Sequence, residues 1–335
     1  MIRPTASVVL PLHNAAPYLS GALRQLAALD ASITYEFIVI DDHSTDATQE
    51  IVSGWSDAIT GRLIIEGAQG SGVSAARNQA LELCSGDFVW FADVDDLWSP
   101  TIVSELVAAI GTAEMAVCNA RKSSPDGSPR GEIVDAPVAE VLSGEEALLR
   151  VLEGSIQGHL WNKLFRRSAL SSGMFPATRA HSDLGGLLSM LPTFATVAMH
   201  PMFLYIYVLR SGSVLNGTGY QWEDLQDCYE IASVESRTVI DRARSARAIT
   251  VFKYRNLIIP TANELARRRA LLTEAELRGI RRQNRRRGGL RDLGVLFHNK
   301  EILVQAALVL LSPALYERVY RARRATSWTP IAAEH

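Results

Sequence analysis

Apolar residues in the first hundred positions form short continuous runs, separated by stretches in which apolar residues recur at helical spacing. The continuous runs are "SVVLPL", "YEFIVIDD", "RLIIEG" and "DFVWFADVDD". Runs of this kind are typical of strands that are buried on both faces. Helical spacing follows in 16–29, from Ser44 onward and from Gly72 onward. The alternation predicts an α/β fold with a mostly parallel sheet flanked by helices.

Local signals predict where several helices begin and end. Ser44 or Thr45 is placed to cap the second helix, and Gly86 is placed to end the third as its C′ glycine. A further helix in "SGEEALLRVLEG" begins with Ser143 and Glu146 at capping-box spacing. Beyond about residue 216 the pattern is helical and predicts no strand, so we expect a C-terminal helical region.

Three carboxylates follow the fourth predicted strand within four residues: Asp93, Asp95 and Asp96. If this segment is extended, Asp93 and Asp95 point to the same side. Mg²⁺ typically binds one or two protein carboxylates together with substrate phosphates, so a metal that bridges a diphosphate would neutralise these charges. The alternative is that one acid caps the next helix and the others are solvated. Ligands of parallel sheets bind beyond the carboxyl ends of the strands, which favours a functional site.

Other candidate ligand-binding residues lie at the same predicted rim of the sheet. Asp41 and Asp42 end the second strand, and they could accept hydrogen bonds from a base or a ribose. Arg77 lies about one turn into the helix that follows a glycine-rich loop. Its planar guanidinium suits phosphate, although a surface arginine is equally consistent with the spacing.

A second motif predicts a different function. The segment Gly70–Ala75 matches G-x-G-x-x-A, and Asp93 lies 23 residues beyond Gly70, as in a dinucleotide-binding fingerprint. An NAD(P)-dependent oxidoreductase is therefore an alternative. The fingerprint normally follows the first strand and needs one acid, whereas here it follows the third strand and three acids are present.

Several segments together resemble the family 2 glycosyltransferases, whose fold is the Rossmann-like GT-A fold. The segments are "SVVLPLHNAAPYL", "FIVIDDHSTDAT", "GVSAARNQAL", "GDFVWFADVDD", "WNKLFRRSAL" and "FLYIYVLRSGSV". One departure is His43, which stands where the family usually has glycine. The resemblance implies a nucleotide-sugar-binding half in 1–110, an acceptor-binding half in 111–215 and a basic helical region in 216–335.

The resemblance also implies roles for individual residues. Asp42 would contact the nucleotide base with help from Asp41, Asp93 would contact the ribose, and Asp95 would bind Mn²⁺ or Mg²⁺. The implied donor-binding residues are Pro11, Asp41, Asp42, Arg77 and Asp93. The implied donor is a nucleotide-sugar, most simply a UDP-sugar.

The implied reaction is an inverting single displacement in which a general base takes the proton of the acceptor hydroxyl. Asp183 is the candidate base, and His181 is the alternative because imidazole titrates near neutral pH. Ser182 stands where the family commonly has glutamate, so a nucleotide-sugar-binding protein without catalysis is a further alternative. The Q-x-x-R-W signature of processive synthases is absent, which favours transfer of a single sugar.

Charge is distributed unevenly between the two parts of the chain. Residues 237–324 hold 21 Lys and Arg but only 7 Asp and Glu, a net charge of +14 against −2 for the whole chain. The segment Arg278–Arg291 contains seven arginines and no aromatic residue, which argues against a nucleic-acid partner that stacks its bases. The partners that fit are a glycan, a lipid-linked or polyol-phosphate acceptor, and an anionic membrane.

The apolar segment Ile302–Leu311 is too short to span a membrane, and it fits either an interfacial helix or a buried helix. The N-terminus lacks the basic and apolar regions of a secretory signal, and the three cysteines show no metal-ligand spacing. We therefore expect a cytoplasmic protein, peripheral at the inner face of the cell membrane, with reduced and buried thiols.

Overall fold

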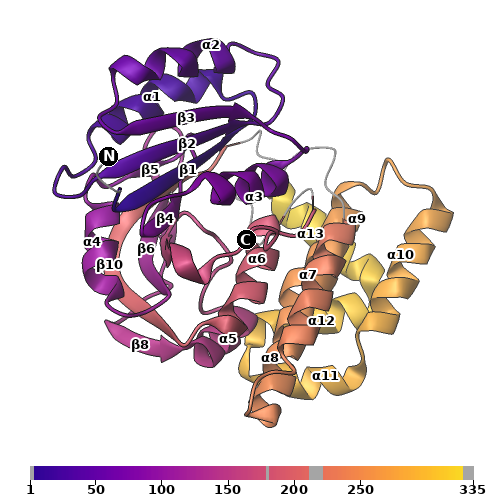
Figure 1. Cartoon of the computed structure of the whole chain (residues 1–335). Helices are drawn as coiled ribbons and strands as arrows, with labels where there is room; N and C mark the ends of the chain where they lie inside the picture. Colours follow the sequence, from indigo (N-terminus) through magenta and orange to yellow (C-terminus); the bar gives the residue numbers. More distant parts are fainter. Residues whose placement is uncertain (1–3, 179–180, 211–221, 327–335) are drawn as a thin grey trace. The chain divides into compact units, whose positions relative to one another are not determined.

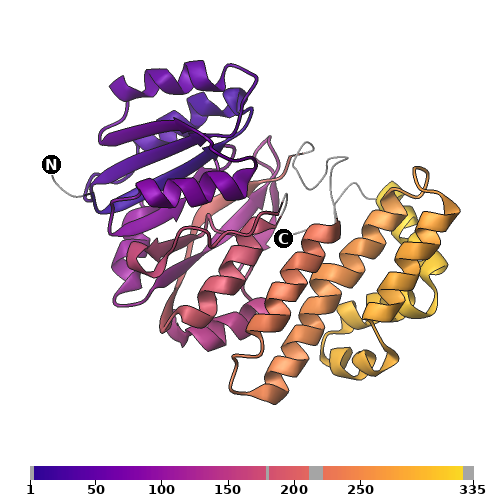
Figure 2. The ribbon, with the colours of Figure 1, turned by 45° about the vertical axis from the view of Figure 1, so that its right-hand side comes forward.

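The computed structural model describes residues 4–178, 181–210 and 222–326 of the chain. The chain forms two compact units. The first comprises Met1–Val151 and Ser155–Gly219, and the second comprises Leu152–Gly154 and Tyr220–His335. Figures 1 and 2 show the strands of the first unit and the helices of the second. The boundary expected at 215/216 lies outside the described residues.

A ten-stranded sheet forms the centre of the first unit, with β3-β2-β1-β4-β9-β6-β10-β5 as its strand order. The four strands expected from the apolar runs are parallel neighbours: β1 (Ala6–Leu12), β2 (Tyr35–Asp41), β3 (Arg62–Gly67) and β4 (Phe88–Phe91). The helices that join them are α1 (Ala16–Ala27), α2 (Thr48–Ser53, continued by η1, Gly54–Asp57) and α3 (Val73–Leu83). In Figure 1, α1 and α2 lie on one face of these strands and α3 lies on the other. This half of the sheet is the expected α/β arrangement.

The second half of the sheet is mixed. Strand β9 (Lys163–Arg166) is antiparallel to both of its neighbours, β4 and β6 (Met115–Ser123), whereas β10 (Thr196–Val208) is parallel to β6. Short antiparallel strands complete the sheet: β5 (Leu97–Trp98), β7 (Pro129–Ile133) and β8 (Glu140–Ser143). The helices and turns of this half are α4 (Ile102–Ile110), α5 (Gly144–Glu153), η2 (Arg167–Ala169), α6 (Ser182–Met190) and η3 (Leu191–Thr193).

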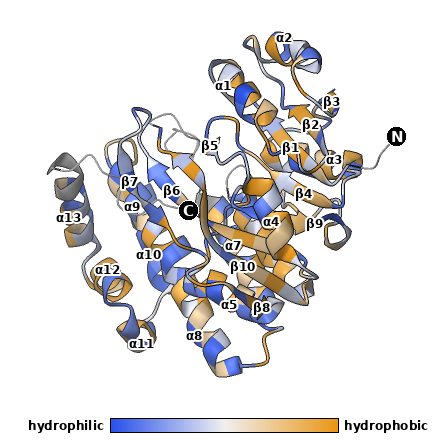
Figure 3. Cartoon of the chain, turned by 90° about the vertical axis from the view of Figure 1, so that its left-hand side faces the viewer, coloured by the Kyte–Doolittle hydropathy of each residue, from blue (hydrophilic) through white to orange (hydrophobic). Residues whose placement is uncertain are grey.

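Buried strand residues form the core of the first unit. All seven residues of β2 are buried, which explains why the run that predicts this strand is nearly continuous. The central strands are coloured mainly as hydrophobic in Figure 3, whereas α10 (Glu274–Arg287) of the second unit is largely hydrophilic. Leu12, Asp41 and Gly67 are paired in register at the carboxyl ends of β1, β2 and β3. The first acid pair therefore lies at the rim of the sheet.

The expected cap of the second helix is wrong. Helix α2 begins at Thr48, and Ala47 occupies the N-cap position. Ser44 instead accepts a hydrogen bond from the Asn14 backbone N–H at 2.8 Å. The carboxylate of Asp46 accepts from the Thr48 backbone N–H at 3.0 Å and from the Ala16 backbone N–H at 3.1 Å. One aspartate therefore serves the first turns of two helices, and Ser44 joins two loops.

The expected role of Gly86 is also wrong. Helix α3 ends at Leu83 with Cys84 as its C-cap, and Gly86 has no left-handed backbone conformation. A Cβ atom at Gly86 would lie 2.7 Å from the Ser7 backbone nitrogen. Glycine is required here because the chain passes directly against β1. The hydroxyl of Ser143 does accept from the Glu146 backbone N–H at 3.1 Å, as expected for the cap of α5.

Among residues 222–326, the second unit consists of helices and the turns that join them. Its elements are α7 (Trp222–Glu235), α8 (Arg242–Lys253), the π-helix η5 (Tyr254–Ile258), α9 (Ile259–Arg267), α10 (Glu274–Arg287), α11 (Leu290–Val295), η6 (Leu296–His298), α12 (Lys300–Leu311) and α13 (Pro313–Thr326). The segment Ile302–Leu311 forms most of α12, which buries Ile302, Ala306 and Val309 while Val304 and Leu311 stay exposed. No helix among the described residues is long and apolar enough to cross a membrane.

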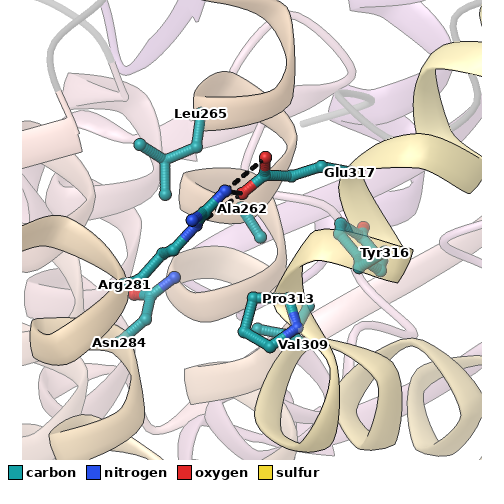
Figure 4. Close-up of a pocket in the computed structure, with 8 residues that line it drawn as sticks. All are labelled: Ala262, Leu265, Arg281, Asn284, Val309, Pro313, Tyr316 and Glu317. Carbon is teal, nitrogen blue, oxygen red and sulfur yellow. Dashed lines mark hydrogen bonds and ion pairs between the residues drawn. The ribbon is translucent and has the colours of Figure 1, made fainter. Parts of the chain in front are cut away.

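An ion pair joins α10 to α13 beside a small pocket (Figure 4). The Arg281 guanidinium donates to the Glu317 carboxylate through Nε at 2.7 Å and through Nη2 at 2.6 Å. Glu317 is 4% exposed, and the Tyr316 hydroxyl beside it donates to Asn263 at 2.6 Å. Arg281 therefore belongs to the packing of the second unit, unlike its exposed neighbours Arg282 and Arg285.

Candidate active site

The three acids after β4 lie on a turn, so the expectation of an extended segment is wrong. The Ala92 backbone N–H still donates to Val9 of β1, but the Asp96 backbone N–H then donates to the Asp93 carbonyl at 3.1 Å. Alternation along a strand therefore does not set the directions of Asp93 and Asp95. The turn places three carboxylates close together at the carboxyl end of a central strand.

Asp96 has a structural role in this turn. Its carboxylate is 2% exposed, and it accepts from the Tyr205 hydroxyl at 2.9 Å and from the Val208 backbone N–H at 2.8 Å. Burial raises the pKa of Asp96 well above its ordinary value, and the charges of Asp93 and Asp95 raise it further. Both hydrogen bonds come from β10, so Asp96 fixes the acid turn to that strand.

Asp93 is an acid whose charge interacts with three other charged residues of the site. Burial raises its pKa to about 6, the Arg77 guanidinium opposes this shift, and the carboxylates of Asp95 and Asp183 add to it. These groups interact only because they are near one another. The structure thus brings together four of the residues expected from the sequence.

Asp95 is the most accessible acid of the turn, with 44% of its side chain exposed. Arg210 donates to its Oδ2 at 2.8 Å and lies 3.9 Å from an oxygen of Asp96. The same guanidinium lies 4.7 Å from the centre of the Tyr18 ring. Arg210 was not among the residues expected from the sequence, because it follows β10 and lies 115 positions from Asp95.

The carboxyl end of β2 provides a second group of acceptors. Asp41 accepts from the Gln49 side chain at 2.6 Å, and Asp42 accepts from the Gly72 backbone N–H at 2.9 Å. In each case the other carboxylate oxygen, Oδ1, is buried and has no hydrogen-bond partner. Buried polar atoms are rarely left unpaired, so these two oxygens indicate where a ligand with hydrogen-bond donors would bind.

Two neighbouring positions explain local features of this end of the sheet. His43 adopts a left-handed conformation, with φ of 57°, which is why glycine suits this position. Its Nε2 atom lies 3.0 Å from the Gly70 carbonyl oxygen. Pro11 is paired in register with Ile40, one residue before the Leu12–Asp41 pair.

Arg77 is 8% exposed and points toward the first turn of α6. Its Nη1 donates to the Ser182 hydroxyl at 3.1 Å, and its guanidinium lies 5.8 Å from the centre of the Phe175 ring. Its Nε is buried without a hydrogen-bond partner. The serine in place of the family's usual glutamate therefore binds Arg77.

Helix α6 carries the candidate base. Asp183 lies in its first turn with 27% of its side chain exposed, and His181 precedes the helix in a left-handed conformation with φ of 60°. A second histidine, His159, lies with Nδ1 at 3.9 Å from Asp183 Oδ2. No sequence pattern indicated His159, because it belongs to the loop between α5 and β9.

The acid turn fits a divalent metal that is bound jointly with a substrate. Among the described residues, no group of three or more His, Cys, Asp or Glu side chains could hold a metal ion. Mg²⁺ and Mn²⁺ need fewer protein ligands when phosphate oxygens complete the coordination. The carboxylates of the turn repel one another, as the effect of Asp93 and Asp95 on the pKa of Asp96 shows, so a cation is favoured there. Arg210 already offsets part of this charge through its hydrogen bond to Asp95.

The glycine-rich loop is engaged with the protein itself. The Gly72 N–H, which a dinucleotide-binding loop would present to a diphosphate, donates to Asp42. The loop also follows β3, which is the edge strand of the sheet and not a central one. Neither feature is typical of the dinucleotide fingerprint.

A sequence model of glycosyl transferase family 2 matches residues 7–173, which include both acid-tipped strands and Arg77. The chain belongs to this family. The crystal structure of Staphylococcus aureus TarS 1–349 in complex with UDP-GlcNAc aligns with 96% of this family 2 chain and 92% of that chain. The TM-score is 0.71 at 18% identity, which shows a shared GT-A fold.

Curated relatives match shorter stretches of this family 2 chain. The Bacillus subtilis (strain 168) protein assigned as glycosyltransferase EpsH is 26% identical over 176 residues, 51% of this chain and 50% of that protein. Poly(ribitol-phosphate) beta-N-acetylglucosaminyltransferase TarS of S. aureus (strain Mu50 / ATCC 700699) is 32% identical over 31% of this chain and 18% of TarS. The chain thus spans about half of EpsH and less of TarS.

Proposed function

We propose that this protein transfers a sugar from a nucleotide-sugar donor, most simply a UDP-sugar, to an acceptor hydroxyl by inverting single displacement. The observation that carries the proposal is the pair of buried Oδ1 atoms of Asp41 and Asp42, which have no protein partner. A uracil ring presents an N–H donor that would satisfy one of them. Pro11, which is paired in register with Ile40, would contact the same base.

The donor's ribose and diphosphate would extend from this end of the sheet toward the acid turn. Asp93 would accept from a ribose hydroxyl, and the guanidinium of Arg77 would face the diphosphate. Asp95 would hold Mn²⁺ or Mg²⁺, which when bound supplies positive charge to the departing diphosphate. Arg210 lies against Asp95, so its guanidinium would have to share or yield this position.

Asp183 would act as the general base. Its carboxylate would take the proton of the acceptor hydroxyl while the hydroxyl oxygen attacks the anomeric carbon. The bond from that carbon to the diphosphate oxygen breaks, and the nucleoside diphosphate leaves with the electron pair. His181, directly before α6, is the alternative base.

The acceptor we propose is a cell-surface glycan, a lipid-linked glycan or a polyol-phosphate chain. The name of TarS gives poly(ribitol-phosphate) as the acceptor of that relative, and phosphate-rich acceptors suit a chain with many arginines. We propose that residues 1–110 bind the donor, 111–215 bind the acceptor and 216–335 contact anionic groups.

The exposed arginines of α10 and α13 are the residues we propose for that contact. They are Arg278, Arg282, Arg285, Arg286, Arg318 and Arg321. They flank the Arg281–Glu317 ion pair in sequence on the two helices. We propose that they bind the headgroup phosphates of an anionic membrane and keep the protein peripheral at its cytoplasmic face.

Two binding experiments test these proposals. UDP should raise the melting temperature only with Mn²⁺ or Mg²⁺ present, and Asp95→Asn should abolish the shift whereas Asp57→Asn, on an exposed 3₁₀ turn, should retain it. A response to NAD without metal would favour the oxidoreductase, and UDP binding without nucleotide release from any donor would favour a non-catalytic protein.

Changing Arg282, Arg285 and Arg286 to Gln should weaken binding to anionic liposomes. Loss of binding only to a soluble polyol-phosphate polymer would assign the arginines to the acceptor.

A further inference from the structure

The loop between α5 and β9 is held by a buried lysine. Lys163 is fully buried, and its ammonium group donates to the carbonyls of Gln157 at 3.0 Å and His159 at 2.7 Å. It also donates to Asn162 at 2.8 Å and lies 3.4 Å from a carboxylate oxygen of Asp135. These bonds fix the backbone of the loop at His159 itself.

The imidazole of His159 is fixed as firmly as its backbone. The ring is stacked on Trp161 with centroids 4.7 Å apart and planes at 19°, and Tyr207 lies 5.9 Å away on β10. The residue is 7% exposed. From this position Nδ1 lies 3.9 Å from Asp183 Oδ2. The imidazole is therefore held with one nitrogen directed toward the candidate base.

We propose that His159 is a positioning residue, whose Nδ1–H orients the carboxylate of Asp183 as that carboxylate accepts the proton of the acceptor. This inference rests on the proposed function, because it assigns a partner to the proposed base. A separation of 3.9 Å is longer than a hydrogen bond, and such contacts are often long without substrate and shorten when it binds. A neutral donor orients a carboxylate without neutralising its charge.

The surroundings of His159 favour the neutral ring. Burial lowers the pKa of His159 to about 4. The carboxylates of Asp183 and Asp135 oppose this shift, whereas the ammonium groups of Lys163 and Lys122 add to it. At neutral pH the ring then carries one N–H, and its stacking partners leave the ring edge free to present that N–H to Asp183.

Two substitutions separate orientation from packing. His159→Phe keeps an aromatic ring against Trp161 and Tyr207 but removes the N–H, whereas His159→Asn removes the stacking and keeps a donor near the position of Nδ1. The assay is release of UDP from UDP-GlcNAc with Mn²⁺, with water as the acceptor. We expect His159→Phe to lower kcat about tenfold and His159→Asn to lower it less, with the Kd for UDP unchanged in both.

Two further measurements distinguish a positioning role of His159 from a purely structural one. The acid limb of the pH–rate profile should lie at higher pH in His159→Phe, because an apolar ring beside the carboxylate disfavours its charged form. Nitrogen-15 NMR should show the His159 signal, identified by its loss in His159→Phe, as the neutral Nδ1–H tautomer.

Three results would overturn the inference: an unchanged kcat and pH profile in His159→Phe, a weaker UDP affinity that accounts for the whole loss, or an Nε2–H tautomer. The variant Asp183→Asn distinguishes a failure of the role proposed for His159 from a failure of the role proposed for Asp183. If Asp183→Asn abolishes UDP release while His159→Phe does not affect it, only the role of His159 is wrong. If Asp183→Asn retains UDP release, the proposed base itself is wrong.

Discussion

Arg77 Nη1 donates a hydrogen bond to Ser182 Oγ at 3.1 Å across 105 positions of the chain. The bond joins α3, which follows the glycine-rich loop, to the first turn of α6, which carries Asp183. Arg77 also interacts electrostatically with Asp93. One guanidinium therefore links the proposed ribose-binding acid with the helix of the proposed base, and the two halves of the site depend on each other through it.

Ser182→Ala should destabilise the protein by about 1–3 kcal/mol, because a buried cationic donor loses its acceptor. Ser182 is 1% exposed, so water cannot replace the hydroxyl without rearrangement. The measurement is chemical denaturation of the variant against wild type. Ser53→Ala removes an exposed serine hydroxyl that bonds Glu50, and it should change stability by less than about 0.5 kcal/mol. Equal losses of stability in both variants would show that the hydrogen bond between Arg77 and Ser182 contributes no more than an exposed one.

The position of three acids at the rim of the sheet could be predicted from the sequence because its signals are local. Asp41, Asp42 and Asp93 each follow directly on an apolar run, and parallel strands bring their carboxyl ends to one rim. The turn at Asp93–Asp96 could not be predicted from the same run. It is fixed by hydrogen bonds from Tyr205 and Val208, which lie more than 100 positions away.

The residues that the sequence did not indicate all act through tertiary contacts. Arg210 reaches Asp95 only because β10 passes the acid turn, and His159 reaches Asp183 only because Lys163 fixes a loop that has no pattern of its own. Gly86 matches the pattern of a helix end, but glycine is required there because the chain passes directly against β1. Local pattern thus predicts which residues lie at a strand end and not which distant residues meet them.

Glu36 should make stability depend on pH. It is fully buried, and it accepts from the Ser7 hydroxyl at 2.6 Å, the Ser85 hydroxyl at 2.7 Å and the Gly86 N–H at 3.0 Å. Burial alone would raise the pKa of Glu36, but these hydrogen bonds outweigh burial and lower it below the ordinary value of 4.5. The stabilisation is therefore present above pH 4.5 and is lost as the pH falls through the lowered pKa.

Glu36→Gln should accordingly cost about 2 kcal/mol at pH 7, because one oxygen that accepts hydrogen bonds becomes an NH₂ group facing donors. Denaturation curves from pH 7 down to pH 3 should show the gap from wild type narrowing as Glu36 becomes protonated. Glu50→Gln, at an exposed position of α2, is the matched control and should differ little from wild type throughout. A gap that stays constant with pH would contradict the pKa argument.

Arg281 and Arg282 are neighbours in sequence, but only the substitution of Arg281 should lower the stability of the protein appreciably. Arg281→Gln removes one partner of the ion pair with Glu317, which is 4% exposed, and should destabilise the protein by about 2–4 kcal/mol. Arg282→Gln should change stability by less than about 0.5 kcal/mol because Arg282 is exposed. Thermal denaturation and liposome binding of both variants provide the measurement. If Arg281→Gln is as stable as Arg282→Gln, the pair does not join α10 to α13.

Gly86→Ala should destabilise the first unit by about 1–3 kcal/mol, because the new methyl group would lie 2.7 Å from the Ser7 nitrogen and 2.8 Å from its hydroxyl oxygen. Backbone atoms of a central strand cannot move aside, so the loop holding Ser85 must shift and weaken its bonds to Glu36.

Gly54→Ala is the matched control, since a Cβ atom there meets nothing within 4 Å and the backbone already has φ of −81°. That variant should be neutral or more stable by up to about 1 kcal/mol, because alanine restricts the unfolded chain. Denaturation of both variants in the Glu36→Gln background tests the mechanism, because the cost of Gly86→Ala should shrink once the Glu36 network is already weakened.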